Sequence, residues 1–441
     1  MNNLTKLEAG GIIRSDSSYL AKVLYLTIIF TITVSPKAFS VVEEIYERDI
    51  PTIQGATVGP LEEDPFSGGL IGFTSDKDWR LLPGFESKTT YDSNTNRERQ
   101  GKTDKRDEDI ILHYTPSIAL IRSGTRFSFR SIYQMSFQEF LRDAKQTGFN
   151  HNVSQSIQYV SPKIKTGITY AFSNTKAAAS DAIAKRRTTV TNNFQPKFEY
   201  QFTRRFSAAA LYEFYELAYK DIGSRDNSNY RRHNTGGRAT YHFSPKMDFF
   251  IEGRDLIVKY YRNGFLDSKG FVLWGGSNVK VTEKFYLTFQ PGYKMQIYKD
   301  STLNTFNGWV FQGDLRYKFS NKMLIFLKAT RDRQETSRAN GGWNIGNNIN
   351  GTVTYKVRPR ISLVLDGSLG RTDYIRETTA VGKTKRKQDH TVVGGALIKW
   401  NPIRTLNFSV GYKLRFKNVN IDNEGDYRAH ILESAMSYKL A

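Results

Sequence analysis

The chain has 441 residues, of which 13% are aromatic, and its mean hydropathy is −0.51. It contains no cysteine, which excludes disulfide bonds and thiolate metal sites. Its net charge of +21, from 64 basic and 43 acidic side chains, favours anionic partners: nucleic acid, anionic lipid headgroups or an acidic solute.

The N-terminal segment, residues 1–40, has the features of a signal peptide. Lys22 precedes an uncharged and mostly apolar stretch, residues 23–34, which Pro36 ends. Residues 38–40 then supply the small side chains expected before a cleavage site. The apolar stretch is too short to cross a bilayer as a helix, and no other long apolar run follows, so we expect no transmembrane helix. An uncleaved anchor or a buried helix is the alternative.

Residues 41–78 differ from the rest of the chain because acidic residues, glycines and prolines interrupt any periodicity. We interpret them as an irregular acidic periplasmic segment. They could form a plug lying in a basic lumen, or a solvated tether, which is the common state of acidic segments rich in proline and glycine.

From Trp79 onward, apolar and polar residues alternate over long stretches. In residues 285–298, for example, Phe285, Leu287 and Phe289 fall on one face and polar side chains fall mostly on the other. Such stretches are longer than an ordinary soluble strand, and they fit tilted strands that cross a bilayer. Counting them predicts about 18 strands over residues 79–441.

Short turns that carry mostly basic residues recur at intervals of roughly 40 residues, which indicates one repeated hairpin unit. They are centred on residues 161–163, 203–205, 244–246, 282–284, 320–322, 358–360 and 401–402. Long polar connections alternate with them, including residues 93–106, 174–188, 220–231, 332–345 and 373–389. Outer-membrane barrels have short periplasmic turns and longer external loops, and an even strand count places both termini in the periplasm.

The predicted fold class is therefore all-β: a transmembrane antiparallel up-and-down β-barrel in the outer membrane of a Gram-negative bacterium. Lipid cannot satisfy a bare backbone N–H or C=O, so a sheet that spans it must close. Aromatic and apolar pairs just before the short turns predict a periplasmic girdle. These are Tyr200 and Phe202, Tyr241 and Phe243, Tyr317 and Phe319, Tyr355 and Val357, and Ile398 and Trp400. A large soluble β-sandwich or β-solenoid is the alternative, but its strands would rarely run this long.

The start of the predicted barrel carries four short motifs, at residues 79–85 (WRLLPGF), 90–94 (TYDSN), 107–110 (DEDI) and 114–118 (YTPSI). In these motifs it resembles the start of the putative β-barrel porin 2 family of outer-membrane proteins. It implies an outer-membrane barrel, in a family of which some members accompany exopolysaccharide export. One departure is the C-terminus, which ends in Ala441 instead of the aromatic residue that the barrel-insertion machinery commonly reads.

The candidate functional residues are basic side chains that alternation places on the lumen side. They are Arg126, Arg130, Lys165, Lys197, Arg238, Lys294, Arg316, Lys318, Lys356, Lys413 and Arg415. Opposing acids are fewer, the clearest being Glu199, Asp314 and Asp366. Arg and Lys rings in a pore favour anions, which suggests passage or binding of an anionic solute such as an exported polysaccharide. The alternative is that these charges are solvated or paired within the lumen.

Other partners follow from the remaining basic residues. Clusters at residues 185–187, 230–232 and 383–387 lie in or beside predicted external loops, where they would meet lipopolysaccharide phosphates or simply keep the loops soluble. Nucleic-acid binding is not expected, because the chain has an export signal and no recognition motif.

We predict no enzymatic activity, no cofactor and no metal. The six histidines include no pair at metal-ligand spacing, and no Gly-x-Ser-x-Gly motif is present. The leading hypothesis is an anion-favouring channel. A closed or plugged structural barrel and a lipid-modifying barrel enzyme are the alternatives.

Overall fold

The computed structural model describes residues 79–95, 108–177, 187–220, 229–261, 264–300, 305–335, 343–374, 388–403, 405–419 and 427–439. The predicted signal peptide and acidic segment, with their boundaries at residues 40 and 78, lie outside these ranges. Within the ranges, no helix has the length and apolar character that crossing a membrane requires.

The described residues form one antiparallel sheet of 18 strands, joined in part by two short 3₁₀ turns, η1 (Ala144–Gln146) and η2 (Gly264–Leu266). The strands are β1 (Arg80–Asp92), β2 (Asp109–Ser123), β3 (Phe127–Phe140), β4 (Gly148–Val160), β5 (Ile164–Ala177), β6 (Arg187–Gln201), β7 (Phe206–Tyr219), β8 (Tyr230–Ser244), β9 (Met247–Tyr260), β10 (Ser268–Thr282), β11 (Phe285–Tyr298), β12 (Phe306–Ser320), β13 (Met323–Glu335), β14 (Trp343–Arg358), β15 (Ile361–Tyr374), β16 (Gln388–Ile403), β17 (Leu406–Val419) and β18 (Tyr427–Lys439).

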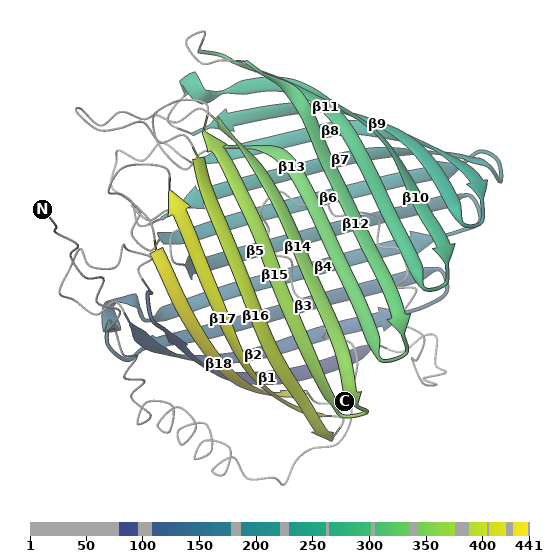
Figure 1. Cartoon of the computed structure of the whole chain (residues 1–441). Coiled ribbons are helices and arrows are strands. Elements are labelled where there is room, and N and C mark those ends of the chain that lie inside the picture. Colours follow the sequence, from purple (N-terminus) through teal and green to yellow (C-terminus); the bar gives the residue numbers. More distant parts are fainter. Residues whose placement is uncertain are drawn as a thin grey trace, which may run out of the picture. The chain divides into compact units, whose positions relative to one another are not determined.

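Each strand pairs with its neighbours in sequence, and the sheet closes on itself (Figure 1). The first strand, β1, pairs with both β2 and β18, with Phe85 opposite Tyr438 in the closing register. Closure gives the backbone groups at both ends of the sheet their hydrogen-bond partners, as a spanning sheet requires. The predicted up-and-down barrel of about 18 strands is confirmed.

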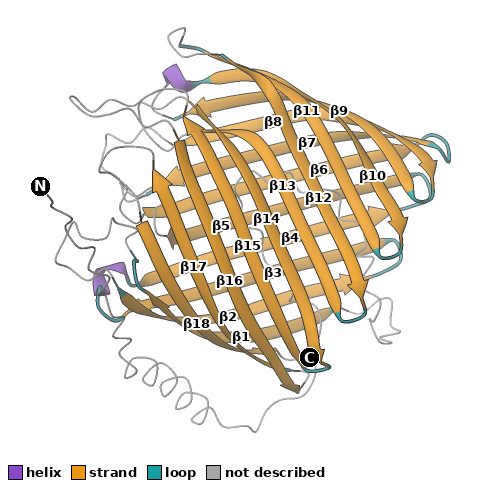
Figure 2. Ribbon diagram, viewed as in Figure 1, coloured by secondary structure: helices purple, strands orange, loops and turns teal. Residues whose placement is uncertain are grey.

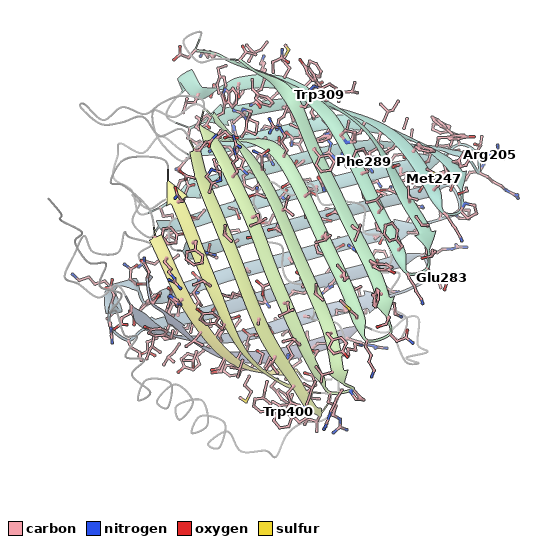
Figure 3. The ribbon with its side chains drawn as sticks, viewed as in Figure 1. Arg205, Met247, Glu283, Phe289, Trp309 and Trp400 are labelled. Carbon is pink, nitrogen blue, oxygen red and sulfur yellow. The ribbon has the colours of Figure 1, made fainter. Side chains whose placement is uncertain are left out.

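Large apolar side chains are exposed on the outer face of the barrel. Trp309 is 70% exposed, Ile251 64% and Val410 57%, and Figure 3 shows Trp309 and Phe289 on this face. Strands of 13 to 16 residues extend about 43–53 Å, enough to cross an apolar band of about 25 Å at a tilt of about 45°. An apolar face of this extent is typical of a surface that contacts a membrane or another protein.

The inner face carries the buried polar groups. Glu252 and Gln296 are each 1% exposed, although both are polar. Ion pairs on this face join strands that are not neighbours: Arg254 in β9 contacts Glu213 in β7, and Lys294 in β11 contacts Asp332 in β13. Such contacts across an intervening strand are possible on the concave side, where side chains converge.

Glycines on the inner face allow large side chains to lie flat along the wall. A Cβ on Gly292 would lie 2.4 Å from the ring of Trp274, and a Cβ on Gly276 would lie 2.4 Å from the ring of Phe250. Trp274 belongs to a buried apolar cluster with Val258, Val272, Phe306 and Val310, among others, from β9, β10 and β12. Several of these residues lie in the half of the wall away from the short turns.

The short turns gather at one end of the barrel (Figure 2) and are built on one repeated pattern. The residue just before an odd-numbered strand offers its C=O to a backbone N–H near the end of the next even-numbered strand. The backbone N–H of Lys318 donates to the C=O of Lys284, and the N–H of Lys356 donates to the C=O of Lys322, both at 2.7 Å. A register shift follows at Lys318/Ser320 and at the matching place in several other even strands. The repeat predicted from sequence is thus a repeated backbone geometry.

The predicted aromatic girdle lies at this end, on the outer face. Phe202 is 57% exposed, Phe243 62%, Phe319 60% and Trp400 49%, and Figure 3 places Trp400 beside the turns. Tyr and Trp rings have an apolar body and a polar tip, so they are suited to the membrane–water interface.

Candidate functional site

All but one of the predicted basic residues occupy inner-face positions of strands. They are Arg130 in β3, Lys165 in β5, Lys197 in β6, Arg238 in β8, Lys294 in β11, Arg316 and Lys318 in β12, Lys356 in β14, and Lys413 and Arg415 in β17. The exception is Arg126, which is exposed in the turn before β3 instead of standing within a strand. Period-2 alternation is reliable inside a strand but loses its meaning where the chain turns.

Several of these cations are paired with acids. Glu199 lies 2.8 Å from Lys197 and 3.9 Å from Lys165. The Glu433 carboxylate lies 2.5 Å from Lys88 and 3.3 Å from Lys413. For this part of the predicted set, the alternative of internally paired charges describes the structure.

Two buried glutamates form a network of ion pairs on β7, β8 and β9. Glu252, whose side chain is fully buried, accepts hydrogen bonds from Arg238 at 2.6 Å and from Arg254 at 2.7 Å. Glu213 accepts bonds from Arg232 at 2.8 Å and from the Asn234 amide at 2.6 Å. The sequence prediction missed both glutamates, although alternation puts them on the same face as Arg238. The signal was present, but nothing in the sequence says which strand each acid contacts.

The network also includes one of the basic clusters predicted in or beside external loops. Residues 230–232 begin β8, directly after the connection from β7. Alternation sends Arg231 and Arg232 to opposite faces: Arg231 lies over the Tyr261 ring, at 5.9 Å, and Arg232 binds Glu213 inside. The cluster at residues 383–387 and most of that at 185–187 lie outside the described residues.

A second group of inner-face cations lies at the short-turn end of β12 and β14. Arg316 and Lys318 stand near the end of β12, and Lys356 near the end of β14. In the part of the chain that the structure describes, none of the three forms an ion pair with a carboxylate. Arg316 stacks over the Phe326 ring at 5.9 Å. Asp314, predicted as an opposing acid, makes no ion pair within the same described ranges.

The arrangement can attract anions at one end of a wide barrel. Barrels of 16 to 18 strands leave an aqueous channel unless something fills it. Uncompensated Lys and Arg at a mouth lower the electrostatic barrier for anions and raise it for cations. The paired charges farther along the wall contribute little net field, because each carboxylate cancels a nearby cation.

Several histidines take part in outer-face hydrogen bonds, whereas His242 contacts Asp248 at 2.7 Å from an inner-face position of β8. Tyr412 and His430 are in hydrogen-bond contact at 2.6 Å, and Tyr133 and His151 at 3.0 Å, with the same diagonal register in both hairpins. Across the described ranges, no group of three or more His, Asp or Glu side chains is placed to hold a metal ion.

Comparisons with known proteins agree with this architecture. The model of a family described as putative beta-barrel porin 2 matches residues 163–439. A search of curated proteins finds no match. Among solved structures, OpdQ of Pseudomonas aeruginosa shares 9% identity at a TM-score of 0.43, with 82% of this chain and 98% of OpdQ covered. OccK2 (OpdF) of the same organism, solved in complex with glucuronate, shares 8% identity at a TM-score of 0.46 with the same coverage. The FrpB iron transporter of Neisseria meningitidis shares 9% identity at a TM-score of 0.41, with 78% of this chain and 62% of FrpB covered.

Proposed function

We propose that this chain, which belongs to the putative beta-barrel porin 2 family, forms a water-filled channel in the outer membrane that favours anions. The observation that carries the proposal is the group of inner-face cations without acidic partners at the short-turn end, represented by Lys318 and Lys356 within the described residues. Their fields add across the mouth, whereas the paired charges of the wall do not.

The proposal includes an orientation. Short turns of outer-membrane barrels face the periplasm, so the basic mouth opens to the periplasmic side. An anionic solute that leaves the cell would meet these lysines first. An exported acidic polysaccharide fits this direction, and the external surface would contact lipopolysaccharide.

A closed structural barrel is the second candidate. One observation favours it: the apolar cluster around Val258 and Val310, each 2% exposed, is buried although both residues occupy inner-face positions. A wall lined by water would leave such side chains more accessible, so this half of the lumen is narrower than an empty cylinder of 18 strands.

Conductance separates the two candidates. The full-length protein would be purified in detergent and inserted into a planar bilayer under a KCl gradient. Steady conductance with a reversal potential shifted toward the chloride equilibrium potential supports the anion-favouring channel. Steady conductance with a reversal potential shifted toward the potassium equilibrium potential contradicts the anion preference. Fully folded protein that shows no conductance supports the closed barrel.

A further inference from the structure

Lysines lie directly opposite one another in three pairs along the short-turn end of β9 to β14. Lys246, which precedes β9, accepts a backbone hydrogen bond from Lys280 at 2.7 Å. The same contact joins Lys284 to Lys318, and Lys322 to Lys356. We call these six residues the lysine arc.

Three of the arc residues, Lys280, Lys318 and Lys356, occupy inner-face positions of β10, β12 and β14, because each follows a residue of the outer set, as Lys318 follows Tyr317. The other three, Lys246, Lys284 and Lys322, stand opposite them in the turns, one position before β9, β11 and β13. Each of the six is exposed or partly exposed. Their ammonium groups can therefore reach water at the mouth.

The arc lysines have no acidic partner among the residues that the structure describes. Like charges directly opposite each other on one face of a sheet are destabilising. In the described part of the chain, no carboxylate forms an ion pair with any of the six lysines. Other inner lysines differ: Lys197 has Glu199 at 2.8 Å and Lys294 has Asp332 at 2.8 Å. An anionic ligand would supply the missing partner.

The spacing of the arc fits a linear ligand. Successive lysine pairs lie two strands apart, which is about 10 Å measured across the strands. A polymer with a carboxylate on each unit can contact several pairs at once, and each contact after the first is favoured by a raised effective concentration. A small anion can occupy only one pair at a time.

Neutral groups beside the arc favour a hydroxylated ligand. Tyr286 lies opposite Lys280 in register. Next to it, the Thr288 hydroxyl lies within hydrogen-bond distance of the Asn278 side-chain oxygen, at 3.1 Å, and of the Tyr286 hydroxyl, at 3.2 Å. Hydroxyl and amide groups of this kind exchange hydrogen bonds readily with sugar hydroxyls.

We propose that the lysine arc is a docking site for a linear carboxylated saccharide chain at the short-turn mouth. The proposal rests on the proposed function, because the docked saccharide chain would pass from this site into the lumen of the proposed channel. It goes beyond a general anion preference because it requires several lysine pairs to act on one ligand molecule.

Binding of galacturonic acid oligomers to the full-length protein in detergent tests the proposal by calorimetry. The hexamer should bind at least 10-fold more tightly than the monomer, because avidity grows with the number of pairs engaged. The double variant Lys284→Gln/Lys318→Gln should weaken hexamer binding about 10-fold and leave monomer binding nearly unchanged. The matched control Lys145→Gln/Lys220→Gln removes two exposed lysines at the opposite end and should leave hexamer binding unchanged.

Three results would overturn the assignment. The first is hexamer binding no tighter than monomer binding. The second is equal loss of binding in the two double variants, each checked for folding by circular dichroism. The third is inorganic polyphosphate binding more tightly than the hexamer, which would make charge density alone the determinant. Hexamer binding by a protein that conducts no ions would refute the proposed channel and leave the docking site standing. Anion conduction without hexamer binding would refute the docking site and leave the proposed channel standing.

Discussion

Replacing Glu252 with Gln should destabilise the barrel strongly. The Glu252 side chain is fully buried and accepts charge-assisted hydrogen bonds from Arg238 at 2.6 Å and from Arg254 at 2.7 Å. Glutamine keeps the volume of the side chain but has one neutral carbonyl oxygen in place of two anionic oxygens. One guanidinium therefore loses its hydrogen-bond acceptor, and both guanidinium groups lose the negative charge that balances them. Arg254 keeps a distant contact with Glu213 at 4.0 Å. Removing one partner of a buried ion pair costs about 3–5 kcal/mol, and the remaining contact puts the expected loss near 3 kcal/mol.

The assay is equilibrium unfolding in guanidinium chloride from lipid vesicles, followed by tryptophan fluorescence. Glu283→Gln is the matched control, because Glu283 is exposed in a short turn (Figure 3); its midpoint should not move. A Glu252→Gln midpoint equal to that of the wild type would refute the reasoning, since it would mean that the two arginines are solvated from the lumen. In that case the β7–β9 wall would be wetter than its burial indicates.

The remaining predictions concern selectivity and packing. The triple variant Arg316→Gln/Lys318→Gln/Lys356→Gln should lower the anion-to-cation permeability ratio about 5-fold, because each screened unit charge about 10 Å from an ion contributes about 0.15 kcal/mol in 0.1 M salt, with opposite sign for anions and cations; an unchanged reversal potential would contradict it. The anion preference of the wild type should also fade between 0.1 and 1 M KCl, as the Debye length falls from about 10 to about 3 Å. Gly292→Ala should cost about 1–3 kcal/mol in the same unfolding assay, because its Cβ would lie 2.8 Å from a backbone oxygen of the neighbouring strand and against a tryptophan ring. Gly394→Ala, where nothing lies within 4 Å, should be neutral or slightly stabilising, because alanine restricts the unfolded chain more than glycine does; equal losses in the two variants would contradict the steric argument for Gly292.

Alternation predicted the strands well because lipid and lumen impose opposite demands on successive side chains. The segment expected at residues 285–298 is β11, Phe285–Tyr298. The strand ends at the long loops were less predictable. Residues 332–345 were expected to form a loop, yet β13 continues to Glu335 and β14 begins at Trp343. Where a strand extends beyond the bilayer, both of its faces contact water. The alternation of apolar and polar residues is therefore lost there, although the backbone pairing continues.

The partners on the inner face could not be predicted from the sequence at all. Lys88 and Glu433 form an ion pair although 345 positions separate them. This contact depends on closure of the barrel and on the register between β1 and β18, and the local sequence pattern predicts neither of them. The sequence therefore predicted which residues face inward, but not which of the inward charges neutralise one another.

That distinction decides how the charge of the wall can act. A cation held against a carboxylate, like Lys294 beside Asp332, presents a dipole whose field falls off within a few ångströms. Lysines such as Lys284 and Lys318, opposite each other and without carboxylate partners in the described part of the chain, present a net field that extends over a Debye length. Conduction requires binding strong enough to admit an ion and weak enough to release it. In the proposed channel, net charge at the mouth with paired charge along the wall would meet both conditions: anions would concentrate where they enter, and no unpaired cation in the described β7–β9 network would hold them as they cross.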